Sequence, residues 1–115
     1  MILAYHWTKM QIAISLMKKK KSDKFLYWST NKDEATWYAK ISKYEDNKYW
    51  KWTIIEAQID DKKTKLLNIN DRKNIYWNEN DILKWENWLL DLWDFKVIIT
   101  QPKQKIEEIK ITEII

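Results

Sequence analysis

The chain contains no glycine in 115 residues, and this absence limits its backbone more than any other feature of the sequence. Glycine adopts left-handed and other strained backbone conformations at little cost. The phosphate-binding loops of Rossmann and Walker-type nucleotide-binding proteins depend on such positions. The sequence therefore excludes both classes of nucleotide-binding fold. The only proline, Pro102, is expected in a connection between two late strands.

Composition favours one folded domain that spans residues 1–115. Hydrophobic residues make up 45% of the chain, with nine Trp and six Tyr, which is enough apolar surface for one core. The chain has no cysteine, so disulfides, thiolate zinc sites and cysteine nucleophiles are excluded. A reducing compartment, the cytoplasm, is the simplest location. The apolar runs are too short to span a bilayer and the first residues do not form a signal peptide, so we expect no membrane partner.

The charge of the chain is carried almost entirely by lysine. The net charge is +4, and Arg72 is the only arginine. Arginine is the residue that reads guanine and clamps phosphate with two hydrogen bonds, so sequence-specific DNA recognition is not expected. The lysine run at residues 18–21 is interpreted as a solvated turn after a helix.

The first half of the chain alternates between strand and helix patterns. The helix at 9–18 would place Met10, Ile12, Ala13, Leu16 and Met17 on one face. The hydroxyl-rich segment Ser29-Thr30-Asn31 predicts the cap of the next helix. The expected strands are 2–8, 25–28 and 49–59, and the expected helices are 9–18 and 32–42.

The second half predicts a helix between short strands. Residues 81–93 have apolar side chains at helical spacing after Asp81, and we interpret them as a third helix. Residues 65–69, 96–100 and 106–115 are expected strands, and 70–80 an irregular segment. Because the last strands follow one another without a helix, we predict an α+β fold. Its sheet or sheets would be mixed and mainly antiparallel, flanked by about three helices.

The tryptophans fall into two expected groups. Trp37, Trp52 and Trp85 occupy patterned positions and are expected in the core. The four to test for surface exposure, as stacking platforms or contacts to a partner, are Trp7, Trp28, Trp50 and Trp77.

Three segments resemble ADP-ribosyltransferases of the His-Tyr-Glu class. The strand ending in Tyr5-His6-Trp7-Thr8 is similar to the family's His-Gly-Thr segment, with Trp in place of Gly. The segments Tyr27-Trp28-Ser29-Thr30 and Ala35-Thr36-Trp37-Tyr38-Ala39 are similar to its second strand and following helix. Asp94, before the apolar strand 96–100, stands where the family has Glu. The resemblance implies an ADP-ribosyltransferase-like fold.

The resemblance also implies roles for individual residues. His6, supported by Thr8, would bind the adenosine ribose of NAD, and the main chain of Trp7 would hold the nicotinamide amide. Tyr27 or Tyr38 would stack on the nicotinamide ring. Asp94 would stabilise the charge that develops at the nicotinamide ribose. The implied catalytic residues are His6, Tyr27 and Asp94, and the implied NAD-binding residues are His6, Trp7, Thr8, Tyr27, Ser29 and Tyr38.

The residues themselves leave other interpretations open. His6 is the only histidine, so a His pair or a three-His metal site within the chain is excluded, and we expect no metal. His6 is equally compatible with a structural role. Helix capping is the favoured explanation for Ser29, and a solvated position between helix and strand is the simplest one for Asp94.

Two functions remain as hypotheses, and the third alternative is an unrelated small α+β domain whose motifs match by chance. In the first, the chain consumes NAD and transfers ADP-ribose to a macromolecular acceptor, a protein in preference to a nucleic acid. In the second, it is a catalytically inactive binding or inhibitor module, from a mobile element, with an aromatic and lysine-rich surface.

Overall fold

The computed structural model describes residues 1–45, 51–67, 87–91 and 96–115. These ranges form an α+β fold with two α-helices, seven strands and one turn of 3-10 helix. The predicted strands at 2–8, 25–28, 49–59, 65–69, 96–100 and 106–115 are confirmed within the described residues, with small changes at their ends. Residues 49–50 and 68–69 of these predictions lie outside the described residues. The helices are α1 (Met10–Lys19), α2 (Lys32–Glu45) and η1 (Asp61–Lys63). The strands are β1 (Ile2–Lys9), β2 (Leu26–Ser29), β3 (Trp52–Ile59), β4 (Thr64–Leu67), β5 (Asn87–Asp91), β6 (Lys96–Thr100) and β7 (Glu107–Ile114).

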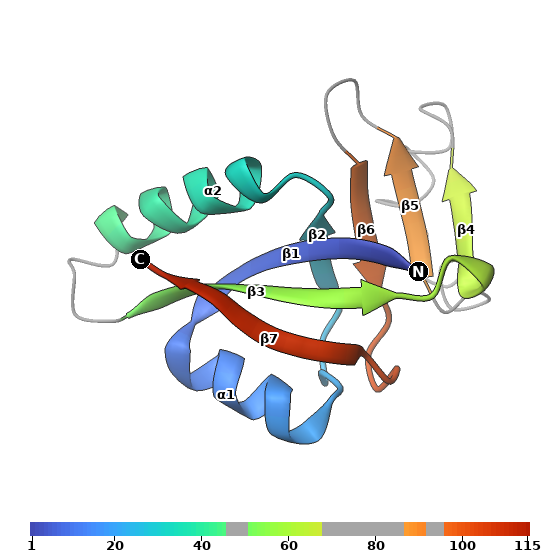
Figure 1. Ribbon diagram of the computed structural model, residues 1–115, viewed down its shortest axis with the longest axis horizontal. Coiled ribbons are helices and arrows are strands. Elements are labelled where there is room, and N and C mark those ends of the chain that lie inside the picture. The colour runs from blue at the N-terminus through green and yellow to red at the C-terminus, as the bar shows by residue number, and fades with distance from the viewer. Residues whose placement is uncertain (46–50, 68–86, 92–95) are drawn as a thin grey trace.

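The strands form one mixed, mainly antiparallel sheet in the order β4-β5-β6-β2-β1-β3-β7. Only the β4–β5 pair is parallel among these neighbours. The sheet has two halves, β3 and β7 with β1, and β4, β5 and β6 with β2. β1 and β3 are paired along their whole length from Ile2 to Lys9, whereas β1 and β2 share one pair, Tyr5 with Ser29. Figure 1 shows the halves running in crossed directions. We call the β1–β2 junction the seam.

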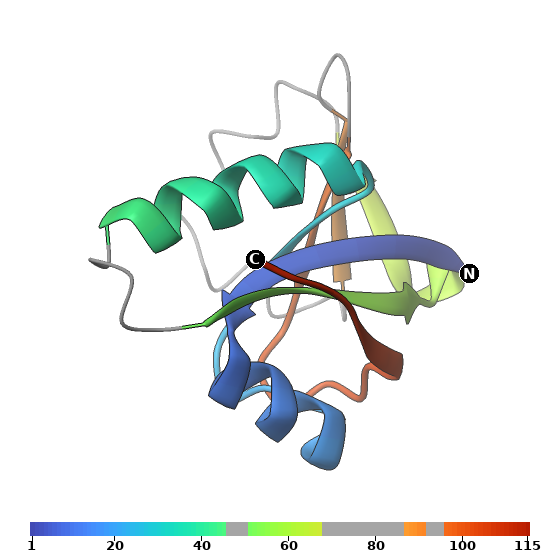
Figure 2. The same cartoon turned by 60° about the vertical axis from the view of Figure 1, so that its left-hand side comes forward.

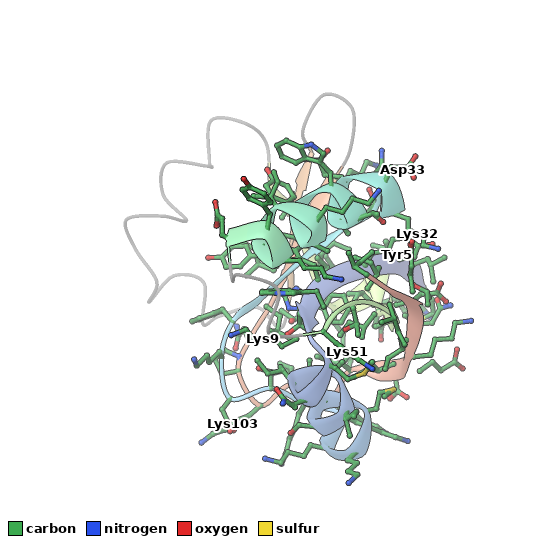
Figure 3. All side chains as sticks on the ribbon, turned by 90° about the vertical axis from the view of Figure 1, so that its left-hand side faces the viewer. Tyr5, Lys9, Lys32, Asp33, Lys51 and Lys103 are labelled. Atoms are coloured by element: carbon green, nitrogen blue, oxygen red, sulfur yellow. The ribbon has the colours of Figure 1, made fainter. Side chains whose placement is uncertain are left out.

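The two helices lie on opposite sides of β1 and β3 (Figure 2). On the α1 side, Ala13 and Leu16 pack in a core cluster with Ala4, Trp28 and Ile55. The cluster contains side chains from both halves of the sheet. On the α2 side, Ala35 and Ala39 pack against Ile54, and Tyr5 lies between α2 and the strands (Figure 3). Alternating side chains along the strands supply both clusters.

The third predicted helix, at residues 81–93, is wrong where the structure describes it. Asn87–Asp91 is strand β5, which pairs with β4 on one side and β6 on the other. The short apolar run Trp88-Leu89-Leu90 is compatible with either structure, and pairing within the sheet decides it. The rest of that prediction, residues 81–86 and 92–93, and the irregular segment 70–80 lie outside the described residues.

The predicted core position of Trp37 is wrong, because the residue is 56% exposed, and Ile12 on α1 is 49% exposed. Of the tryptophans to be tested for exposure, Trp28 is fully buried and Trp7 is half-buried. Trp52, expected in the core, is also half-buried. Trp37 points outward because the small side chains of Ala35 and Ala39 form the buried face of α2. Trp50, Trp77 and Trp85 lie outside the described residues.

Left-handed backbone does occur in this chain without glycine. Lys20 has φ 55° and ends α1, where its N–H donates to Leu16 O over 2.8 Å. Lys103 and Glu108 also have positive φ, at 65° and 52°. A non-glycine residue in this conformation costs roughly 1 kcal/mol. Neither described α-helix is long and apolar enough to cross a membrane.

Candidate functional site

His6 lies on β1 at the seam, and its side chain bonds to the neighbouring strand. Its Nδ1 is 2.7 Å from the main-chain oxygen of Tyr27 on β2. A carbonyl oxygen can only accept, so Nδ1 carries the hydrogen in this bond. In the neutral ring Nε2 is then a hydrogen-bond acceptor. The contact brings together two sequence motifs that are 21 residues apart.

Two tryptophans surround the imidazole. Its ring centroid is 5.6 Å from that of Trp7 and 5.4 Å from that of Trp28. Burial among these rings lowers the pKa of His6 from 6.5 to about 4, and the bond to Tyr27 O opposes this only in part. His6 is therefore neutral at pH 7, in the state that offers Nε2 as an acceptor.

Tyr27 contributes its main chain to this contact and its side chain to another surface. Leu26 and Trp28, on either side of it, belong to the core cluster on the α1 side. Side chains alternate along a strand, so the Tyr27 phenol points to the other face of the sheet, the one that α2 covers. The residue is 44% exposed. The structure thus joins His6 to the Tyr27 main chain and sends the two side chains to different faces.

Tyr38 lies on the α2 side in an aromatic cluster with Trp7 and Trp37. Its ring stacks on Trp7, with centroids 4.8 Å apart and planes at 17°. Trp37 meets Tyr38 edge to face at 5.1 Å. One face of the Tyr38 ring is therefore covered by Trp7, and another flat ring can stack there only if Trp7 moves.

Thr8 and Ser29 are buried, at 6% and 3% exposure. The Thr8 main-chain oxygen accepts a bond from Thr53 Oγ1 over 3.0 Å. Ser29 Oγ accepts from Asn31 N and donates to Asn31 O. Asn31 Oδ1 then accepts from Asp33 N over 2.9 Å and caps α2. The predicted capping role of this segment is confirmed, and the Ser29 hydroxyl is engaged in the turn.

Asp94 lies outside the described residues. The nearest described residue after it is Lys96, at the start of β6. Lys96 N donates to Thr30 Oγ1 over 3.0 Å, and Thr30 N donates to Lys96 O over 2.9 Å. The start of β6 is thus bonded directly to the end of the Tyr27-Trp28-Ser29-Thr30 segment.

The sequence interpretation missed the contact between Trp28, which packs beside His6, and Thr100. Trp28 Nε1 donates to Thr100 Oγ1 over 3.0 Å in the core, and both residues are fully buried. They are 72 positions apart in sequence, so no local pattern connects them. The sequence signal that could have indicated a buried hydrogen bond was the hydroxyl of Thr100 at the end of the apolar strand Val97-Ile98-Ile99-Thr100.

A separate cavity of about 340 Å³ opens beside Thr100. Its wall combines amide, lysine and carboxylate side chains, and none of the predicted site residues contributes to it. No group of three His, Cys, Asp or Glu side chains suited to a metal ion occurs in the part of the chain that the structure describes. The cavity is lined by Met1, Gln58, Ile59, Asp60, Lys63, Thr100, Gln104, Lys105, Ile106, Glu107 and Glu108.

Comparison with protein-family models, with curated proteins and with solved structures finds no match to this chain.

Proposed function

We propose that the chain is an ADP-ribosyltransferase-like domain that binds NAD and transfers ADP-ribose to a macromolecule, a protein in preference to a nucleic acid. The observation that carries the proposal is the bond between His6 Nδ1 and Tyr27 O. It joins the two segments that resemble the family's NAD-binding motifs, at the point where the two halves of the sheet share a single pair.

The neutral imidazole suits this role chemically. With its hydrogen on Nδ1, His6 can accept a hydrogen bond from a ribose hydroxyl at Nε2. In the described residues no bond to Nε2 is found, and His6 keeps part of its surface exposed. The depressed pKa keeps this acceptor available at every pH above about 4.

The remaining groups would supply stacking and charge. Tyr27 or Tyr38 would stack on the nicotinamide ring, and Trp7 covers one face of Tyr38. Both phenols lie on the α2 face of the sheet, so NAD would have to extend from the α1 face, where the His6 side chain lies, to the α2 face. The main chain of Trp7 would hold the nicotinamide amide, with Thr8 and Ser29 shaping the two strands. Asp94 would stabilise the positive charge that develops on the ribose as its bond to nicotinamide loosens. No metal takes part in this scheme.

Release of nicotinamide from NAD tests the proposal. The wild-type chain should release it, and Asp94→Ala should reduce the rate on the order of a hundredfold or more, with Asp94→Glu retaining activity. Asp33→Ala is the matched control, since Asp33 is exposed on α2. Saturating NAD at a hundred times its Kd should add about 2.7 kcal/mol to the free energy of unfolding. The proposal is excluded if the wild type releases no nicotinamide and NAD does not stabilise it.

A binding or inhibitor module, from a mobile element, is the second candidate, and the outer surface of α2 favours it. Trp37 and Tyr44 are 56% and 78% exposed there. Exposed Trp and Tyr are common centres of protein interfaces and of single-strand binding. In this case Trp37→Ala and Tyr44→Ala would abolish partner capture, while Asp94→Ala would leave it intact. A complex with nucleic acid would weaken steeply with salt.

We place the protein in the cytoplasm in either case. The absence of cysteine is the observation that supports a reducing compartment.

A further inference from the structure

Trp28 is a core side chain whose one polar atom has a defined partner. Its indole is fully buried, and Nε1–H donates to Thr100 Oγ1 over 3.0 Å. Trp28 pairs with Ile98 of β6, so Thr100 is its diagonal neighbour on the same face of the sheet. A flipped indole would leave the N–H unpaired in an apolar core, at a cost of about 1–3 kcal/mol. The Thr100 hydroxyl therefore selects one orientation of the ring.

In this orientation the Trp28 indole packs against the His6 imidazole. The two ring centroids are 5.4 Å apart and the planes are at 46°. The bond from His6 Nδ1 to Tyr27 O fixes one atom of the imidazole but does not by itself prevent the ring from rocking about that bond. Trp28 and Trp7 pack against the ring and restrict this motion.

We propose that Thr100 is a positioning residue for His6: its hydroxyl holds the Trp28 indole, and the indole holds the imidazole so that Nε2 is presented to a substrate hydroxyl. Thr100 itself does not contact the imidazole and acts through Trp28. The substrate part rests on the proposed function. The positioning part can be measured without any substrate.

The single histidine makes the measurement direct, since both imidazole C–H resonances in an NMR titration belong to His6. Thr100→Val keeps the side-chain shape and removes the hydroxyl. We expect the indole to loosen, water to reach the imidazole, and the pKa of His6 to rise from about 4 toward 6.5 by about one unit or more. Thr100→Ser keeps the hydroxyl and should titrate like the wild type.

Thr112→Val is the matched control. It removes a hydroxyl that donates to Ile54 O over 3.1 Å on β3, a bond that does not involve Trp28. Its His6 titration should equal that of the wild type. Trp28→Phe provides a second route if Thr100→Val does not fold, because it removes the N–H and keeps an aromatic ring. It should raise the pKa of His6 in the same direction, and adding Thr100→Val to it should change the titration little further.

Turnover provides the second readout. In Thr100→Val we expect kcat/KM for NAD to fall about ten- to hundredfold, because a small displacement of a group that binds substrate has effects of this size. Thr112→Val should retain wild-type kcat/KM.

The outcomes separate the two proposals. If Thr100→Val and Trp28→Phe titrate like Thr112→Val, the positioning role is wrong, whether or not the wild type consumes NAD. If both variants shift the titration while the wild type releases no nicotinamide, the positioning of His6 stands and the proposed function fails.

Discussion

The two helices cover opposite faces of the same strands in different ways. α1 contributes Leu16 to a cluster that contains the fully buried Trp28. α2 buries only two alanines and carries its large side chains, Trp37 and Tyr44, on the outside. Burial of large apolar side chains is the main favourable term in folding. We therefore expect the α1 side to supply more of the stability than the α2 side, whose large side chains are exposed.

The largest expected change in stability comes from removing one aromatic side chain on the α1 side of the sheet and one on the α2 side. Trp28→Ala should lower the free energy of unfolding by about 3–5 kcal/mol, through the cavity it leaves in the core. Trp37→Ala should cost less than about 1 kcal/mol, because the residue is largely exposed. Urea denaturation of both variants measures the difference. Equal losses would mean that the two sides contribute alike.

A smaller effect tests how closely α2 packs. Ala39 is fully buried between α2 and the sheet, so Ala39→Leu should push the helix away and cost about 1–3 kcal/mol. Lys40→Leu, at the exposed neighbouring position, adds similar apolar volume on the outer surface and should change stability little. Thermal unfolding of the two variants makes the comparison. Tolerance of leucine at position 39 would show that α2 is loosely attached.

The smallest expected effect concerns pH and the α1 side, where His6 meets Trp28. The pKa of His6 is about 4 in the folded chain and 6.5 as the ordinary value, so the unfolded chain binds more protons between these two pH values. The stabilisation is complete above about pH 6.5 and is lost as pH falls toward 4. Between pH 7 and pH 5 we expect the free energy of unfolding to fall by on the order of 1–2 kcal/mol more in the wild type than in His6→Gln, since His6 is partly exposed to solvent.

Urea midpoints for both proteins at the two pH values measure this. Carboxylates that titrate in the same range affect both proteins equally and cancel in the difference. Parallel losses in the wild type and His6→Gln would show that His6 is not held neutral by its surroundings.

The sequence predicted correctly those elements whose signal lies in a few consecutive residues. The capping segment before α2 and the alternation along β3 were recognisable because a cap and a pleat each involve a few consecutive residues. Asn87–Asp91 was misassigned because its place between β4 and β6 is a tertiary property. Periodicity also marked Trp37 as patterned, although the small side chains of Ala35 and Ala39 form the buried face of α2.

The candidate site divides in the same way. His6 and Tyr27 were found from short motifs, but the use of the Tyr27 main chain and the separation of the two side chains follow from strand pairing. Trp28 and Thr100 come together through a register between β2 and β6 that no local pattern encodes. Asp94 remains a prediction.

The seam also determines how the two halves of the sheet respond to temperature. Because β1 and β2 share one residue pair, the core cluster that contains Ala4 and Ile55 from one half and Trp28 and Ile98 from the other supplies much of the attachment. Hydrophobic attraction between apolar side chains weakens on cooling, unlike a ladder of main-chain hydrogen bonds. In the cold, the junction beside His6 is therefore expected to loosen before the continuous β1–β3 ladder does.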